Sequence, residues 1–121
     1  HRNLVAYPGT HDNNTTVGWW EHELTLPEAR QYAHTYLDLD RPDADVHEQA
    51  LRSLLASVAD RVVTPLHDVL GLGEEARMNN PGEPEGNWTW RVTPDQVTEE
   101  AEDRLATFTR IYGRAEDYST E

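Results

Sequence analysis

The order strand, polar loop, helix occurs twice in this chain and constrains its fold more than any other feature. The apolar run NLVAY ends at Pro8-Gly9 and continues into the polar segment THDNNTT. A shorter run, RVV at 61–63, continues into TPLHDVLGLG. Runs that are apolar throughout are typical of strands in a parallel sheet whose two faces are both covered. The sequence therefore predicts an α/β fold, mostly helical, with one or two short parallel strands.

Apolar positions at helical spacing predict the segments between these strands. A short helix is expected around 17–20, and longer amphipathic helices are expected over 27–37 and 46–60. The segment 74–94, EEARMNNPGEPEGNWTWRVTP, is dense in Gly, Pro and Asn. Such a composition predicts an ordered loop or lid instead of a helix or strand.

A last helix is predicted to begin at the sequence TPDQ. Thr93 can cap it, Pro94 suits the first helical position, and Gln96 can complete a capping box. The helix is expected to end at Gly113. Its apolar stripe would consist of Val97, Ala101, Leu105, Phe108 and Tyr112.

Length and charge exclude several classes of protein. At 121 residues the chain has room for one domain with a modest core, and its hydrophobic content of 36% is low for a free-standing domain. A net charge of −13 disfavours nucleic acid and anionic membranes as partners. The sequence has no apolar run of about 20 residues, the length of a membrane span. It also has no cysteine, which fits a cytoplasmic enzyme.

His11 and Asp12 are the first candidates for chemistry. They lie in the loop after the first predicted strand, and in a parallel β/α architecture such loops converge on the active site. Asp12 could hold a substrate hydroxyl or a developing positive charge, while His11 could donate a hydrogen bond to a sugar or phosphate oxygen. In the alternative interpretation, Asp12 caps the helix that follows and His11 only fills space.

A metal site is the second possibility for this His-Asp pair, because the same doublet occurs in helical metal-dependent phosphohydrolases. Those enzymes need further histidine ligands, whereas the histidines here show no pairing at a spacing of four residues. We therefore expect no metal site and no cofactor. The six histidines stand at positions 1, 11, 22, 34, 47 and 67.

The loop RMNNPGEPEGNWTWR combines aromatic rings with amide and guanidinium donors, as carbohydrate subsites do. For Trp88 and Trp90 we favour the alternative that both are buried and structural. Arg77 or Arg91 would then fix the loop by hydrogen bonds to backbone carbonyls. For Asn79, sugar contact and a structural role stay equally open.

Two stretches, AYPGTHDNNTTVGWW and PLHDVLGLGEEARMNNPGEPEGNWTWR, together resemble the C-terminal part of 4-alpha-glucanotransferases, the amylomaltase or disproportionating-enzyme family. The resemblance covers nearly the whole chain and is weakest over 24–60. It implies that residues 1–121 form a single fragment, the C-terminal portion of a (β/α)8 TIM barrel that contains its last β/α units. The rest of the barrel, expected upstream, would then be its partner.

The resemblance also implies a reaction and residue roles. Family members transfer α-1,4-glucan segments between maltooligosaccharides with retention, using an Asp nucleophile, a Glu acid/base and a second Asp that stabilises the transition state. The stabilising Asp matches Asp12, its neighbour that contacts sugar matches His11, and a further sugar contact matches Asn79. The other two carboxylates are expected upstream, so we predict that the fragment alone is inactive.

This sequence departs from the family pattern at two places. Glu83 stands where Thr is common, and His67-Asp68 replaces a usual Gln-Asp, which leaves contacts to the acceptor sugar open. Two other functions remain as alternatives. One is a non-catalytic glucan-binding module built on the tryptophan loop, and the other is the metal-dependent phosphohydrolase.

Overall fold

A computed structural model describes residues 2–40 and 44–115, and it contains a two-stranded parallel sheet. Strand β1 (Arg2–Ala6) pairs with β2 (Ala59–Val62), with Ala6 opposite Val62 and a register irregularity earlier in β1. A hydrogen bond of 3.0 Å from the Val63 amide to the Ala6 carbonyl extends the pairing at the carboxyl end. The prediction of a mostly helical α/β chain with two short parallel strands is confirmed.

Three helical segments follow β1. They are α1 (Thr16–Gly18), a π-helical turn η1 (Trp19–Glu23) and α2 (Pro27–Tyr36). The hydroxyl of Thr15, which is fully buried, accepts from the Gly18 amide at 3.0 Å and caps α1. Arg30 holds α2 against η1, because its guanidinium lies 4.0 Å from the Trp20 ring centroid and donates to the Trp20 carbonyl at 2.6 Å.

Helix α3 (Val46–Leu55) is shorter than the predicted 46–60. Ser57 explains the early end, since its hydroxyl donates to the Leu54 carbonyl at 2.6 Å and accepts from the Ala59 amide at 3.3 Å. Ala59, expected on the helix, is instead a fully buried residue of β2, and Val58 is 56% exposed. Arg114 stabilises this junction by donating to the carbonyls of Leu55, Ser57 and Ala59 at 2.7, 3.0 and 2.9 Å.

The second unit continues with α4 (Leu66–Leu70), a 3-10 turn η2 (Glu74–Ala76), a long loop, a second 3-10 turn η3 (Pro94–Gln96) and α5 (Glu99–Ile111). The predicted start of the last helix at TPDQ is wrong. The capping box of Thr93 and Gln96 closes η3, whereas α5 begins after Thr98, whose hydroxyl accepts from the Ala101 amide at 3.2 Å. The predicted end is confirmed, since Gly113, with a φ of +69°, follows Tyr112, the C-cap residue of the helix.

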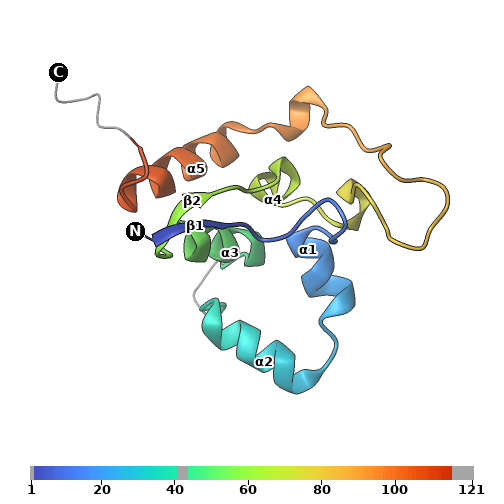
Figure 1. Cartoon of the computed structure of the whole chain (residues 1–121), viewed down its shortest axis with the longest axis horizontal. Coiled ribbons are helices and arrows are strands. Elements are labelled where there is room, and N and C mark those ends of the chain that lie inside the picture. The colour runs from blue at the N-terminus through green and yellow to red at the C-terminus, as the bar shows by residue number, and fades with distance from the viewer. Residues whose placement is uncertain (1, 41–43, 116–121) are drawn as a thin grey trace.

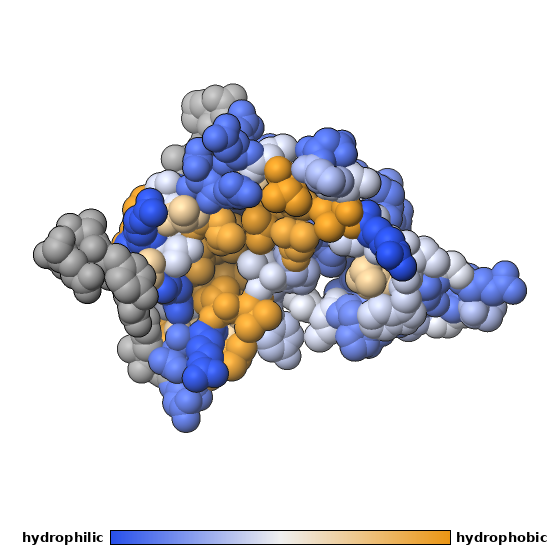
Figure 2. All heavy atoms as spheres, turned by 90° about the horizontal axis from the view of Figure 1, so that it is seen from above, coloured by the Kyte–Doolittle hydropathy of each residue, from blue (hydrophilic) through white to orange (hydrophobic). Residues whose placement is uncertain are grey.

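Among the described residues the buried core is small and is formed by α3, β2, α4, η2 and α5. Its members are Leu51, Leu55, Ala59, Val69, Ala76 and Ala101. Large apolar side chains elsewhere are exposed, including Val5 of β1 at 49% and Val63 after β2 at 59%. Figure 2, which views the molecule from the side of α5 in Figure 1, shows apolar residues gathered in one continuous area. The low hydrophobic content thus corresponds to a core that leaves much apolar surface uncovered.

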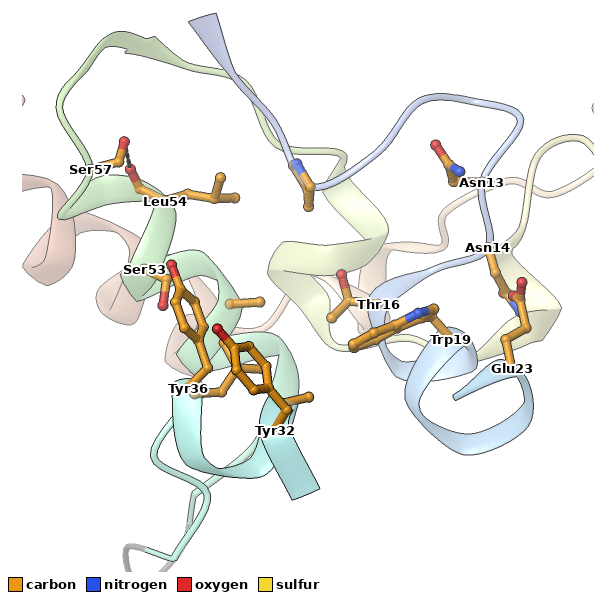
Figure 3. Close-up of a pocket in the computed structure, with 14 residues that line it drawn as sticks. Asn13, Asn14, Thr16, Trp19, Glu23, Tyr32, Tyr36, Ser53, Leu54 and Ser57 are labelled. Atoms are coloured by element: carbon orange, nitrogen blue, oxygen red, sulfur yellow. Dashed lines mark hydrogen bonds between the residues drawn. The ribbon is translucent and has the colours of Figure 1, made fainter. Parts of the chain in front are cut away.

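Helix α2 is set apart from the sheet, on the opposite side of the strands from α5 in Figure 1. Between α2, α3 and the loop after β1 lies a cavity of about 630 Å³. Figure 3 shows Trp19 of η1 across this cavity from Tyr32 and Tyr36 of α2. Among residues 2–40 and 44–115, no helix is both long and apolar enough to cross a membrane.

Candidate active site

A tight turn at the carboxyl end of β1 presents His11 and Asp12. The Thr10 amide donates to Asn13 Oδ1 at 2.7 Å, and the Asp12 amide lies 3.3 Å from the Thr10 hydroxyl, which accepts from it. These local bonds satisfy backbone groups within the turn. Both presented side chains remain open to solvent, at 56% for His11 and 49% for Asp12.

The structure brings together all three site residues predicted from the sequence. Asn79, which is 67 residues away in the chain, donates from Nδ2 to Asp12 Oδ1 at 2.5 Å. His11 Nε2 lies 3.4 Å from Asp12 Oδ2. One carboxylate thus interacts with an amide through one oxygen and with an imidazole through the other. Asp12 does not cap the following helix, because Thr15 fills that position.

Arg77 links the two loops that carry these residues. Its Nη2 donates to the Asp12 carbonyl at 3.0 Å, and its Nε donates to the Asn79 carbonyl at 3.0 Å. The side chain is 17% exposed, and its Nη1 lies 3.9 Å from a Glu23 carboxylate oxygen. The expectation that Arg77 binds backbone carbonyls is confirmed, and both carbonyls belong to residues of the candidate site.

Asp68 fixes the end of the same loop, where α1 begins. This buried carboxylate accepts from the Thr16 amide at 2.7 Å, which fixes the start of α1 four residues after Asp12. From the sequence alone, His67-Asp68 was noted only as a departure from the family pattern that leaves contacts to the acceptor sugar open. Both residues are buried, and burial lowers the pKa of His67, although the neighbouring Asp68 carboxylate opposes this shift. The sequence signal for this role was a carboxylate, Asp68, within the short and otherwise largely apolar helix α4.

The two loop tryptophans differ, and the prediction that both are buried is wrong for Trp88. Its side chain is 57% exposed, and its ring centroid lies 4.9 Å from that of His11. Trp90 is half-buried, with its ring edge-on to His67 at 6.3 Å. The backbone of Trp88 has a φ of +59°, which directs the chain differently from a regular extended loop. Trp90 therefore packs, whereas Trp88 stands at the open side of the site.

Comparison with known proteins assigns the family. A family model described as 4-alpha-glucanotransferase matches residues 1–98. The chain belongs to the 4-alpha-glucanotransferase family. It is 41% identical to the 4-alpha-glucanotransferase of Synechocystis sp. over 112 residues, which is 93% of this chain and 22% of the relative. It is 40% identical to the 4-alpha-glucanotransferase of Thermus thermophilus over 109 residues, 87% of this chain and 21% of the relative.

A solved structure agrees with these sequence relatives. The amylomaltase from Streptococcus agalactiae in complex with acarbose superposes with a TM-score of 0.85 and 36% identity, over 93% of this chain and 22% of that one. The chain thus spans about a fifth of the length of the 4-alpha-glucanotransferases it matches. The family resemblance inferred from the two motifs is confirmed, and it favours the glucanotransferase over the phosphohydrolase alternative.

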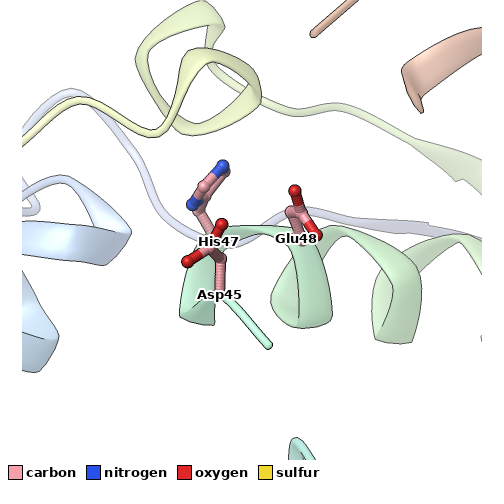
Figure 4. Close-up of side chains that lie close together, drawn as sticks. All are labelled: Asp45, His47 and Glu48. Atoms are coloured by element: carbon pink, nitrogen blue, oxygen red, sulfur yellow. The ribbon is translucent and has the colours of Figure 1, made fainter. Parts of the chain in front are cut away.

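The group of side chains that most resembles a metal site does not include His11 or Asp12. Among the described residues, only Asp45, His47 and Glu48 bring three potential ligand atoms together, all within 4.8 Å (Figure 4). The Arg104 guanidinium already contacts two of them, with Nη1 at 2.6 Å from Glu48 Oε1 and Nη2 at 3.5 Å from His47 Nε2. Burial, reinforced by Arg104, lowers the pKa of His47. A cationic side chain of the protein thus already binds two of the three residues of this cluster.

Proposed function

We propose that this chain is the C-terminal portion of the (β/α)8 catalytic barrel of a 4-alpha-glucanotransferase and carries one of its catalytic carboxylates, Asp12. The observation that supports this best is the position of Asp12 at the carboxyl end of β1, held by Asn79 from the long loop between η2 and η3. Active sites of such barrels form from loops at the carboxyl ends of adjacent parallel strands. The catalytic face of the proposed barrel is therefore the end of the sheet where these two loops meet.

The proposed reaction transfers an α-1,4-glucan segment from one maltooligosaccharide to another with retention. Retaining enzymes use a nucleophile and an acid/base about 5 Å apart and pass through an oxocarbenium-like transition state. The negative charge of Asp12 would stabilise that positive charge, because its exposed side chain can face the sugar. The Asn79 amide holds Asp12 Oδ1 in place, and His11 can donate to a sugar hydroxyl.

The nucleophile and the acid/base would come from a part of the enzyme outside this chain. The chain matches only 22% of the Synechocystis enzyme, and Val5 and Val63 leave apolar surface on the sheet uncovered. In this proposal the other strands and helices of the barrel cover that surface. The isolated chain is therefore inactive. A cytoplasmic location for the complete enzyme fits a chain without cysteine.

A chimera with a related enzyme tests the proposal. This chain would replace the segment that it matches in the amylomaltase from Streptococcus agalactiae, which is 22% of that protein. Incubated with maltotriose, the chimera should release glucose and form longer maltooligosaccharides, whereas the 121-residue chain alone should do neither. A chimera that folds with the circular dichroism spectrum of the parent amylomaltase but releases no glucose would contradict the proposal.

A further inference from the structure

Trp88 exposes a large apolar ring to water, which is unusual for a tryptophan. The side chain is 57% exposed although the residue belongs to a loop with many internal contacts. Exposed indoles of this kind are enriched where a protein binds a partner, because the ring offers a wide apolar face and one N–H donor. The exposure therefore points to a ligand.

Hydrogen bonds within the loop fix the backbone that carries this ring. The Trp88 amide donates to the Met78 carbonyl at 2.6 Å. The preceding Asn87 accepts from the Asn80 amide at 2.8 Å and donates to the Glu83 carbonyl at 2.8 Å. These bonds keep Trp88 in the left-handed region, at a φ of +59°, which is unfavourable for a bulky residue. Such a conformation persists because the surrounding loop maintains it.

The position of the ring connects it to the candidate site. Its centroid lies 4.9 Å from that of His11, with an angle of 41° between the two planes. His11 lies beside Asp12, and Asn79 of the same loop bonds to Asp12. The site thus combines the apolar face of Trp88 with three polar groups. These are the imidazole of His11, the carboxylate of Asp12 and the amide of Asn79. A pyranose ring has an apolar face of C–H groups and an edge of hydroxyls, so it can use both kinds of contact.

We propose that Trp88 is a stacking platform for a glucose unit of the α-glucan, beside the unit that faces Asp12. This inference rests on the proposed function and names a binding residue for it. The indole face contacts the C–H face of the sugar, while Asn79 and His11 bind hydroxyl groups. Trp90, half-buried against His67, packs the loop and does not contact sugar.

Nuclear magnetic resonance on the 121-residue chain tests this residue by residue. Maltotriose, titrated to tens of millimolar, should shift the indole N–H signal of Trp88 in a saturable manner and leave that of Trp90 unchanged. Trp88→Asn removes the ring but tolerates the left-handed backbone, and it should weaken binding at least tenfold. Trp88→Phe, which keeps an aromatic face, should retain most of the affinity, and Trp90→Phe should retain all of it.

Two outcomes would overturn the inference. If the Asn79 side-chain amide shifts with maltotriose while the Trp88 indole does not, sugar binds at the Asp12 site without the platform. In that case the proposed function survives and the role of Trp88 is wrong. If neither signal shifts, Trp88 is not a sugar platform in this chain, and the activity of the chimera decides the proposed function separately.

Discussion

The carboxyl end of the sheet and the surface of its strands differ in how far this chain completes them. At the carboxyl end, Asn79, Arg77 and Asp68 connect segments more than fifty residues apart through bonds of 2.5 to 3.0 Å. On β1 and directly after β2, Val5 and Val63 stay about half exposed. The chain thus builds its part of a polar site by itself, whereas its apolar surface needs a neighbour. Site geometry and core packing are therefore separable here, and each can be perturbed alone.

The largest effect on stability should come from polar substitutions on the uncovered strand surface. In the chimera, Val5→Ser with Val63→Ser should lower the free energy of unfolding by about 3 kcal/mol, since both side chains would be buried there. In the isolated chain the same pair should change stability little, because the side chains are already exposed. Urea unfolding followed by circular dichroism measures both.

Val92→Ser on the exposed loop serves as the control and should be neutral in both proteins. Equal losses of stability in the chimera and in the isolated chain would show that the strand surface is not covered by the barrel. The conclusion that this chain completes its polar site but not its apolar core would then be wrong.

Arg77→Met should damage the site more than the fold. It removes the donors to the Asp12 and Asn79 carbonyls, and hydrogen bonds from charged groups contribute roughly 1.5–3 kcal/mol each. We expect the rate of maltotriose disproportionation by the chimera to fall by about 10- to 100-fold, equivalent to roughly 2 kcal/mol. Arg91→Met, at an exposed position of the same loop, is the matched control. A rate that drops only in proportion to lost folded protein would count against a positioning role.

The sequence predicted the site better than the packing, for physical reasons. The order of strand and loop was sufficient to place His11 and Asp12 at the carboxyl end of β1. The contact between Asn79 and Asp12 was not predictable from the sequence pattern. The two residues are 67 positions apart, and local periodicity carries no information on contacts at that separation. The family resemblance supplied Asn79 as a candidate, and the structure supplied its partner.

Errors in the predicted helices arose where one residue fitted two structures. Ala59 continued the apolar spacing of α3, but Ser57 ended the helix and Ala59 joined β2 instead. Thr93 and Gln96 formed the expected capping box, yet it closed a single 3-10 turn. Trp88 was predicted to be buried together with Trp90, and its left-handed backbone has no sequence signal in a residue that usually avoids it.

The smallest effect concerns pH and the α3 side of the molecule. Burial, followed by Arg104, lowers the pKa of His47 from its ordinary value of 6.5. Below about pH 6.5 the unfolded chain therefore binds more protons than the folded chain, so stability is lost as pH falls and is retained above that pH. His67 contributes in the same direction through its own burial.

His47→Gln should consequently reduce the difference between urea midpoints measured at about pH 5.5 and about pH 7.5, on either side of the ordinary histidine pKa, without changing the activity of the chimera at the higher pH. A difference as large as that of the unsubstituted chain would show that His47 does not contribute to the pH dependence. His67→Gln would then identify how much of it comes from the second histidine.

The most direct test is the activity of the chimera with Asp12→Asn, alongside Asp103→Asn at an exposed position on α5. If Asp12 stabilises the transition state, kcat/KM for maltotriose should fall by a thousandfold or more, equivalent to about 4 kcal/mol, with the melting temperature little changed. The Asp103→Asn chimera should keep its activity. Nearly full activity in the Asp12→Asn chimera would show that the carboxylate held by Asn79 takes no part in catalysis.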